Sequence, residues 1–234
     1  MAKTKQSAPK SGGNDLLENP EALAEQLSRT EEFLESNKNV VFGIGGFIAV
    51  LIAGYILFNY YTSSQNETAQ REMFQAVYYY EADSLGKALN GDGNSYGFLE
   101  IIEEFPLTDA ANLAQFYTGN TYLKLGDFDG AIRYLNEFTS SDYLVQARAY
   151  SLVGDAYAEL GQYGDAISSY EKAISYYPNK EFTPVYLTKA AVVYEADGQL
   201  DEALRCYKQI LEDYPQSAEQ RDAKKHQARI EGIL

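Results

Sequence analysis

One stretch of this sequence restricts its fold and setting more than any other. Residues 40–58 read VVFGIGGFIAVLIAGYILF, nineteen consecutive residues without a charge, an amide or a proline. As a helix they would extend roughly 28 Å at about 1.5 Å per residue, close to the hydrocarbon thickness of a bilayer. A helix also satisfies its own backbone hydrogen bonds in lipid. We therefore expect a single transmembrane helix at 40–61, with Tyr55, Tyr60 and Tyr61 in the interfacial aromatic belt.

A cleaved secretory signal is the alternative use of such a stretch. A signal begins near residue 1, has a shorter apolar core and ends in a small-residue cleavage site, whereas residues 59–64 offer no such site. Arg29 and Lys38 precede the stretch closely, and only Arg71 follows it at a similar distance. Because Lys and Arg favour the cytoplasmic side, we expect a cytoplasmic tail at 1–39 and a domain outside the cytoplasm.

The tail is expected to contain a short amphipathic helix at 20–36. Asn19, Pro20 and Glu21 form a helix start, with a capping side chain, a proline in the first turn and an early acidic residue. A weakly apolar stripe and many glutamates follow. Two interpretations stay open: a docking helix for a cytoplasmic protein partner, and a solvated helix that leads into the span.

A stripe of small residues runs along the predicted span. Gly45, Ala49 and Ala53 recur every four residues, on one helical face. Such a face lets another transmembrane helix approach closely. We therefore predict a helix contact here; because small residues are common in any transmembrane helix, a plain tether remains the alternative.

The composition excludes several classes of function. The net charge of -15 argues against nucleic acid or an anionic membrane surface as a partner. With one Cys and one His, the chain cannot form an intrachain disulfide, a histidine-based triad or a Cys/His metal cluster. The adjacent acids Glu103 and Glu104 would point in different directions on a helix. We expect no catalytic residue, no metal and no cofactor, although an envelope enzyme stays a distant alternative.

Residues 67–106 predict a degenerate first unit of a helical repeat. After a polar connector at 63–69, the apolar spacing favours helices at 67–89 and 96–105. The loop 90–94 between them is rich in Gly and Asn. A calcium loop would need Gly and Glu where this sequence has Ser and Ile, so a plain turn is expected.

Three later segments, at 112–146, 147–180 and 184–217, align on one template. Each has a small residue at its eighth place, Tyr at its eleventh, a Gly at the turn and Ala at its twentieth. Small side chains let two helices cross closely, and a turn Gly ends the first helix. The pattern resembles the tetratricopeptide repeat, two antiparallel helices in ~34 residues, with a capping helix at 218–231. The expected fold is all-α: an N-terminal transmembrane helix followed by an α-solenoid of such helical hairpins.

In a stack of this kind the first helices of the units line a concave groove, which suits an extended polypeptide segment. Places two, five and nine of each unit are expected to face it. Each of these residues has the alternative of packing against a neighbouring helix. The predicted groove residues are Leu113, Phe116 and Asn120; Arg148, Ser151 and Asp155; Val185, Thr188 and Val192; and Tyr79 and Asp83 from the degenerate unit.

The whole layout, with residues 29–38 and 96–138 in particular, resembles YfgM-like proteins in their Bacteroidetes-type version. These are ancillary subunits of the bacterial SecYEG translocon. The resemblance implies a single-pass inner-membrane protein with a cytoplasmic N-terminus and a periplasmic domain, and no catalytic residues. It implies two partners, the SecYEG translocon and a membrane-anchored periplasmic isomerase-type chaperone. The alternative is an envelope-biogenesis or cell-division scaffold without translocon contact.

Overall fold

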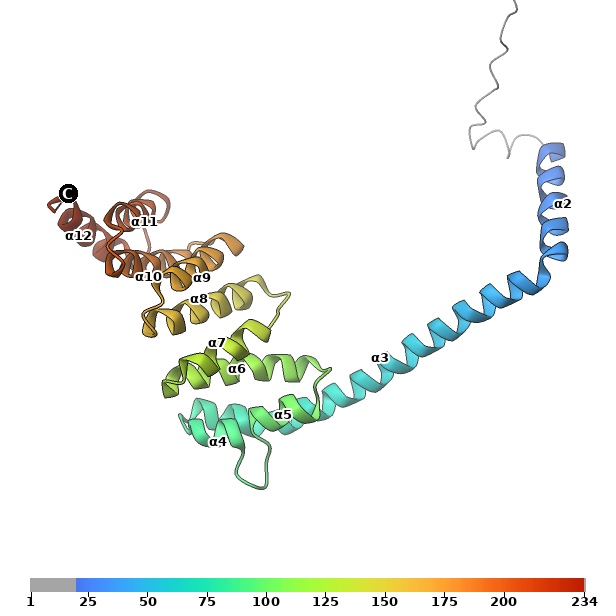
Figure 1. Cartoon of the computed structure of the whole chain (residues 1–234), viewed down its shortest axis with the longest axis horizontal. Helices are drawn as coiled ribbons and strands as arrows, with labels where there is room; N and C mark the ends of the chain where they lie inside the picture. The colour runs from blue at the N-terminus through green and yellow to red at the C-terminus, as the bar shows by residue number, and fades with distance from the viewer. Residues whose placement is uncertain (1–19, 234) are drawn as a thin grey trace, which may run out of the picture. The chain divides into compact units, whose positions relative to one another are not determined.

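The computed structural model describes residues 20–233 (Figure 1). Every regular element in these residues is a helix. The chain divides into two compact units, one up to Tyr60 and one from Tyr61 onward. The predicted tail residues before Pro20 lie outside the described residues. The expectation of an all-α fold is therefore confirmed for the described part.

The first unit contains α2 (Pro20–Ser36) and the beginning of α3 (Lys38–Glu81). α2 covers residues 20–36, for which the sequence predicts an amphipathic helix. Asn37 separates the two helices: its backbone N–H and its side-chain Nδ2 both donate to the carbonyl oxygen of Phe33, each at 3.0 Å. In the described residues, α3 is the one helix long and apolar enough to cross a membrane, judged by length and composition, and its most apolar window has no buried residue.

The polar connector predicted at 63–69 is wrong, because α3 continues through it without a break. The segment has no Gly and no Pro, so nothing in it opposes a helix strongly. Thr68 instead donates its hydroxyl to the carbonyl of Ser64 at 3.3 Å, inside the helix.

The helix predicted at 67–89 ends earlier, at Glu81. Asp83 takes a left-handed conformation, with φ 55°, which reverses the chain. A separate short helix, α4 (Leu85–Asn90), follows. The loop 90–94 is a turn, as expected, and Asp92 stabilises it by accepting hydrogen bonds from the backbone of Asn94 and Ser95 at 2.9 and 2.8 Å.

The second unit continues with helices stacked in layers, which follow one another from green to dark red in Figure 1. The short helix α5 completes the degenerate unit, three hairpins follow it, and α12 ends the stack. Their bounds are α5 (Phe98–Glu104), α6 (Asp109–Leu125), α7 (Phe128–Glu137), α8 (Tyr143–Glu159), α9 (Tyr163–Tyr176), α10 (Thr183–Ala196), α11 (Leu200–Asp213) and α12 (Gln220–Glu231).

The first two hairpins begin a few residues before the predicted starts at 112 and 147, because polar caps lie upstream. Thr108 accepts a hydrogen bond from the N–H of Ala111 at 3.1 Å and so caps α6. Asp142 caps α8 by accepting from the N–H of Leu144 at 2.9 Å. Each cap satisfies a backbone donor that would otherwise be unpaired at the helix start.

The glycines of the repeat act as expected. Gly126, Gly161 and Gly198 have φ of 82°, 70° and 78°, the left-handed region that ends a first helix. A Cβ at Gly119 would lie 2.5 Å from Cγ of Leu135, and one at Gly154 would lie 2.7 Å from the ring of Tyr170. The prediction that small residues allow the helices to cross is confirmed at these two positions.

The hydrophobic core forms a series of clusters along the stack. Met73 and Ala76 of α3 pack with Phe98 and Ile101 of α5 and with Ala114 of α6. The later part of α3 therefore serves as the first helix of the degenerate unit. A second cluster joins α7 to α8, and a third contains residues of the four consecutive helices α9, α10, α11 and α12.

Candidate functional site

The predicted groove residues differ in how much of them solvent reaches. Asn120 and Ser151 are only 8% and 2% exposed, so their side chains are interior and not available to a partner. That part of the groove prediction is corrected. The exposed members are Asp83, Leu113, Arg148 and Val192, and the half-buried members are Tyr79, Phe116, Asp155, Val185 and Thr188.

The ninth place of the first two repeats ties neighbouring units together. Asn120 of α6 donates from Nδ2 to the hydroxyl of Tyr80 on α3 at 2.7 Å. Asp155 of α8 accepts two hydrogen bonds from Nζ of Lys189 on α10, at 2.8 and 2.6 Å. These side chains are used inside the stack, because a buried amide and a half-buried charge each need a hydrogen-bond partner.

Asp155 also organises its own hairpin. The hydroxyl of Tyr170 on α9 donates to Oδ1 of Asp155 at 2.7 Å. Burial, together with the neighbouring Asp155 carboxylate, raises the pKa of Tyr170 well above its usual range. Tyr170 therefore stays protonated and remains a hydrogen-bond donor.

A second set of polar contacts fixes the capping helix. Glu195 of α10 accepts from the hydroxyl of Tyr207 at 2.9 Å and pairs with Arg229 of α12. Burial opposes ionisation of Glu195, but the hydrogen bonds from Arg229 and Tyr207 outweigh it and lower the pKa of this carboxyl. His226 stacks on Tyr207, with ring centroids 5.1 Å apart. The predicted capping helix at 218–231 thus corresponds to α12.

A further tie joins α9 to α10, where the hydroxyl of Tyr194 donates to Oε1 of Glu171 at 2.7 Å. Between the first two hairpins, Ala131 and Leu135 of α7 pack against Leu152, Val153 and Ala156 of α8. The N–H of Ser140, in the loop before α8, also donates to Oε1 of Gln146 on α8 at 2.7 Å.

The two predicted groove residues of the degenerate unit, Tyr79 and Asp83, both have partners within the second unit. Tyr79 donates its hydroxyl to Asp92 at 2.7 Å. Asp83 lies in the turn after α3 and pairs with Lys124 of α6 at 3.4 Å. Both contacts are exposed, so they contribute little to stability.

The surface left for a partner is a mixture of aliphatic and polar side chains. Each first helix of the three hairpins has one exposed member: Leu113 on α6, Arg148 on α8 and Val192 on α10. Near the turns, Asp155 lines an open hollow of about 580 Å³ together with Lys124 and Tyr170. Such a surface offers apolar contact and donors for the backbone of an extended chain.

The chemistry of reactive side chains is limited in the described residues. Among residues 20–233, no three His, Cys, Asp or Glu side chains come together in a metal-binding arrangement. Cys206 is buried, and its burial raises the pKa of the thiol to about 11. The acids Glu103 and Glu104, the remaining enzymatic alternative, are both exposed at the end of α5.

The small-residue stripe lies on the exposed apolar part of α3. A Cβ added at Gly45 would meet nothing within 4 Å, and Ala49 and Ala53 are exposed. The expected contact of Gly45, Ala49 and Ala53 with another helix stays a prediction.

Comparison with known proteins places the repeats. Two family models, both described as tetratricopeptide repeat, match residues 113–142 and 145–216. No match is found among curated proteins. A crystal structure of a thermophilic TPR protein in Thermus thermophilus is similar at 21% identity and a TM-score of 0.33, over 71% of this chain and 100% of that one. Residues 113–142 and 145–216 are, by the two family models, tetratricopeptide repeats, which form a module for protein–protein interaction and are generally scaffolds.

Proposed function

We propose that this chain is a membrane-anchored interaction protein whose repeats bind polypeptide partners in the bacterial periplasm. The observation that carries the proposal is the composition of α3. Its apolar stretch has no buried residue in its most apolar window, while Ala69, Met73 and Ala76 of the same helix are buried in the repeat unit. Apolar surface as large as this is not left in water, and lipid is the environment that its length fits.

The groove chemistry supports an extended polypeptide as the ligand. Leu113 and Val192 offer aliphatic contact, and Arg148 offers a charged donor for carbonyl oxygens or carboxylates. The ligand is bound along the first helices, so its side chains would contact one hairpin after another.

For the cellular partners, we propose an ancillary role at the SecYEG translocon together with a membrane-anchored periplasmic isomerase-type chaperone. The support is the resemblance of residues 29–38 and 96–138 to YfgM-like proteins, combined with one anchor and an acidic repeat unit. In this role the repeats would contact segments that emerge from the channel, and Gly45, Ala49 and Ala53 would contact a helix of the membrane complex.

The topology has a direct test. Protease added outside spheroplasts is expected to digest the chain after Phe58 and to leave the residues before Val40 protected. Protection of the repeat unit until the membrane is permeabilised would overturn the proposed orientation.

The partner proposal is tested by affinity isolation from gently solubilised membranes. SecY is expected in the eluate of the native chain, and less of the client polypeptide is expected with the pair Leu113→Asp and Val192→Asp. The matched control is Tyr177→Asp with Ile233→Asp, which changes two exposed hydrophobic side chains outside the first helices of the units. Absence of SecY from every eluate would count against the translocon and favour an envelope-biogenesis or cell-division scaffold. Equal client recovery from the two pairs would contradict the groove.

A further inference from the structure

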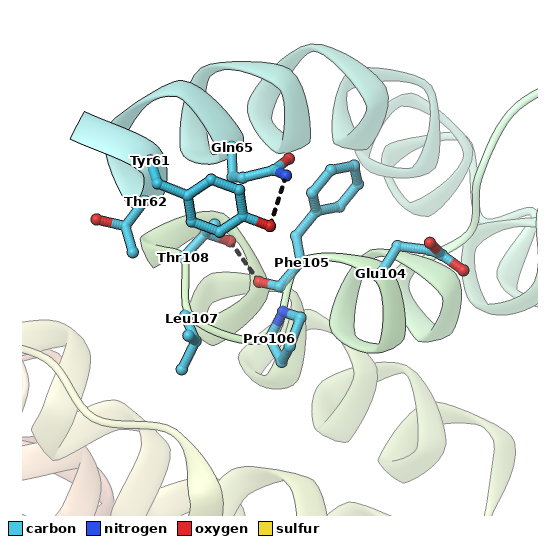
Figure 2. Close-up of a pocket in the computed structure, with 8 residues that line it drawn as sticks. All are labelled: Tyr61, Thr62, Gln65, Glu104, Phe105, Pro106, Leu107 and Thr108. Atoms are coloured by element: carbon cyan, nitrogen blue, oxygen red, sulfur yellow. Dashed lines mark hydrogen bonds between the residues drawn. The ribbon is translucent and has the colours of Figure 1, made fainter. Parts of the chain in front are cut away.

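A small hollow of about 80 Å³ lies where the second unit begins (Figure 2). It is enclosed by Tyr61, Thr62 and Gln65 of α3 and by residues 104–108, which end α5 and form the loop to α6. Because one wall is helix and the other is loop, the hollow marks where this loop rests against α3.

Hydrogen bonds order both walls of the hollow. Within α3, Gln65 donates from Nε2 to the hydroxyl of Tyr61 at 3.0 Å, and within the α5–α6 loop, residues 105–108, Thr108 donates its hydroxyl to the carbonyl of Phe105 at 2.8 Å (Figure 2). The N–H of Ala110, in the first turn of α6, donates to Oδ1 of Asn66 on α3 at 3.0 Å. The first turn of α6, which directly follows the loop, is therefore tied to α3.

Leu107 is a hydrophobic residue that does not belong to the core. Its side chain is 66% exposed, and Pro106 beside it is exposed as well. Figure 2 shows Leu107 on the side of the loop where Tyr61 and Thr62 lie, whereas Glu104 lies at the opposite side of the hollow. Leu107 and the carboxylate of Glu104 thus lie on different sides of the hollow.

The position of this tip along the chain is the second observation. Tyr61 follows Phe58, the last residue of the apolar stretch, by three residues, a rise of about 4.5 Å along a helix. Tyr60 and Tyr61 are both exposed, as interfacial tyrosines are. The helical wall of the hollow therefore begins three residues after the apolar stretch in the sequence.

The charges near the loop define the kind of surface that it fits. Between Lys87 and Lys124 the sequence has no Lys or Arg, and Glu104 and Asp109 flank the loop. An ionic attraction to anionic lipid is excluded by this arrangement. The loop therefore suits a bilayer whose headgroups are zwitterionic, where it would make apolar contact.

We propose that the α5–α6 loop inserts Leu107 into the headgroup region of the bilayer, as a second membrane contact that does not span. The contact rests on the proposed membrane anchor. It restrains the repeat unit at the membrane through apolar burial, which is how interfacial segments bind.

The experiment uses the full chain in phosphatidylcholine vesicles with an environment-sensitive fluorophore attached to a single introduced thiol. The positions are Leu107→Cys, Leu57→Cys in the anchor, and Leu125→Cys at the far end of α6, which is 52% exposed. The native Cys206 is buried, so the unchanged chain is the labelling blank. We expect lipids with a quencher near the top of the acyl chain to reduce fluorescence at positions 57 and 107 and not at position 125.

Each outcome decides between the two proposals. Quenching at 57 with no more quenching at 107 than at 125 overturns the loop contact and leaves the anchor standing. No quenching at 57 overturns the anchor, and the loop contact falls with it. Loss of the signal at 107 in high salt would show an ionic contact and overturn the apolar one.

A second pair of variants separates the effect of the fluorophore from that of the leucine. The probe is placed at Pro106→Cys, once with Leu107 and once with Leu107→Asp. Quenching at position 106 is expected to be lost with the aspartate, and equal quenching in the two chains would contradict a contact made by Leu107.

Discussion

The two parts of α3 form one helix, but the side chains of the first part are exposed and one stripe of the second part is buried against other helices. In the stretch 40–58 the large hydrophobic side chains are exposed, apart from Val41, which is half-buried. After Tyr61 the same helix buries Ala69, Met73 and Ala76, while Phe74 and Tyr78 stay exposed. The backbone hydrogen bonding is alike in both parts, so the side chains alone set what each part contacts.

One helix can therefore suit lipid along one part and a protein core along another. A stretch that is apolar all round is suited to lipid, and an amphipathic stretch buries one stripe against protein. In the second part, the buried residues are small or flexible, which allows α5 and α6 to approach closely. The four predictions below are ordered from the largest expected effect to the smallest.

The largest effect is expected for Ile48→Arg, near the middle of the apolar stretch. An arginine at the centre of a membrane helix costs about 2.5–3.5 kcal/mol of insertion free energy. Carbonate extraction of membranes should release this variant and retain Ile48→Leu. Tyr78→Arg, in the amphipathic part, is the matched control and should be retained. Release of both arginine variants would contradict the difference between a lipid-facing first part and a protein-packed second part of α3.

Ala76→Leu should destabilise the repeat unit, because Ala76 of α3 is 0% exposed and lies in one core cluster with residues of α5 and α6. Overpacking of a filled core costs typically about 1–3 kcal/mol. Urea unfolding of the full chain in detergent, followed by circular dichroism, measures the free energy of unfolding. Phe74→Leu, at a side chain that is 73% exposed, is expected within about 0.5 kcal/mol of the native chain. Equal losses would show that α3 is not packed as described.

Tyr80→Phe removes the hydroxyl that accepts from Asn120 and leaves a buried amide without this partner. The expected loss of unfolding free energy is about 1–3 kcal/mol, and nearer the lower value if water replaces the hydroxyl. Tyr78→Phe is the control, because Tyr78 is exposed on the same helix. A loss in the control as large as in Tyr80→Phe would argue against the tie.

The smallest effect on the chain itself is expected when Gly45, Ala49 and Ala53 are all replaced by Leu. Insertion should be unchanged, since leucine favours the membrane. Recovery of the membrane complex should fall, because the close-packing face is lost. The control is Phe47→Leu with Leu51→Ile on another face of the helix. If the triple leucine variant recovers as much of the membrane complex as the native chain, the span serves only as a tether.

The features predicted from sequence are those that local chemistry determines. Gly126, Gly161 and Gly198 mark the turns because only glycine takes a left-handed conformation without strain. The helix at 20–36 followed from its start signals and was found with the same bounds. Repeat places eight and twenty followed from the steric need for small residues at a crossing.

The features that were missed depend on partners far away in the sequence. Asn120 and Asp155 read as groove residues because their place in the repeat is on the first helix. Their hydrogen-bond partners, Tyr80 and Lys189, lie 40 and 34 residues away. The pattern of the repeat contains no signal for such pairs. The continuity of α3 through 63–69 was missed for a different reason: polar residues are neutral toward a helix that neighbouring turns already support.

The ties between hairpins make each hairpin depend on its neighbour. Where Lys189 meets Asp155, sliding one hairpin over the next breaks directed, charge-assisted bonds. Separating these two hairpins would leave the half-buried carboxylate of Asp155 without its cationic partner. The charge itself therefore opposes the loss of a single hairpin from the stack.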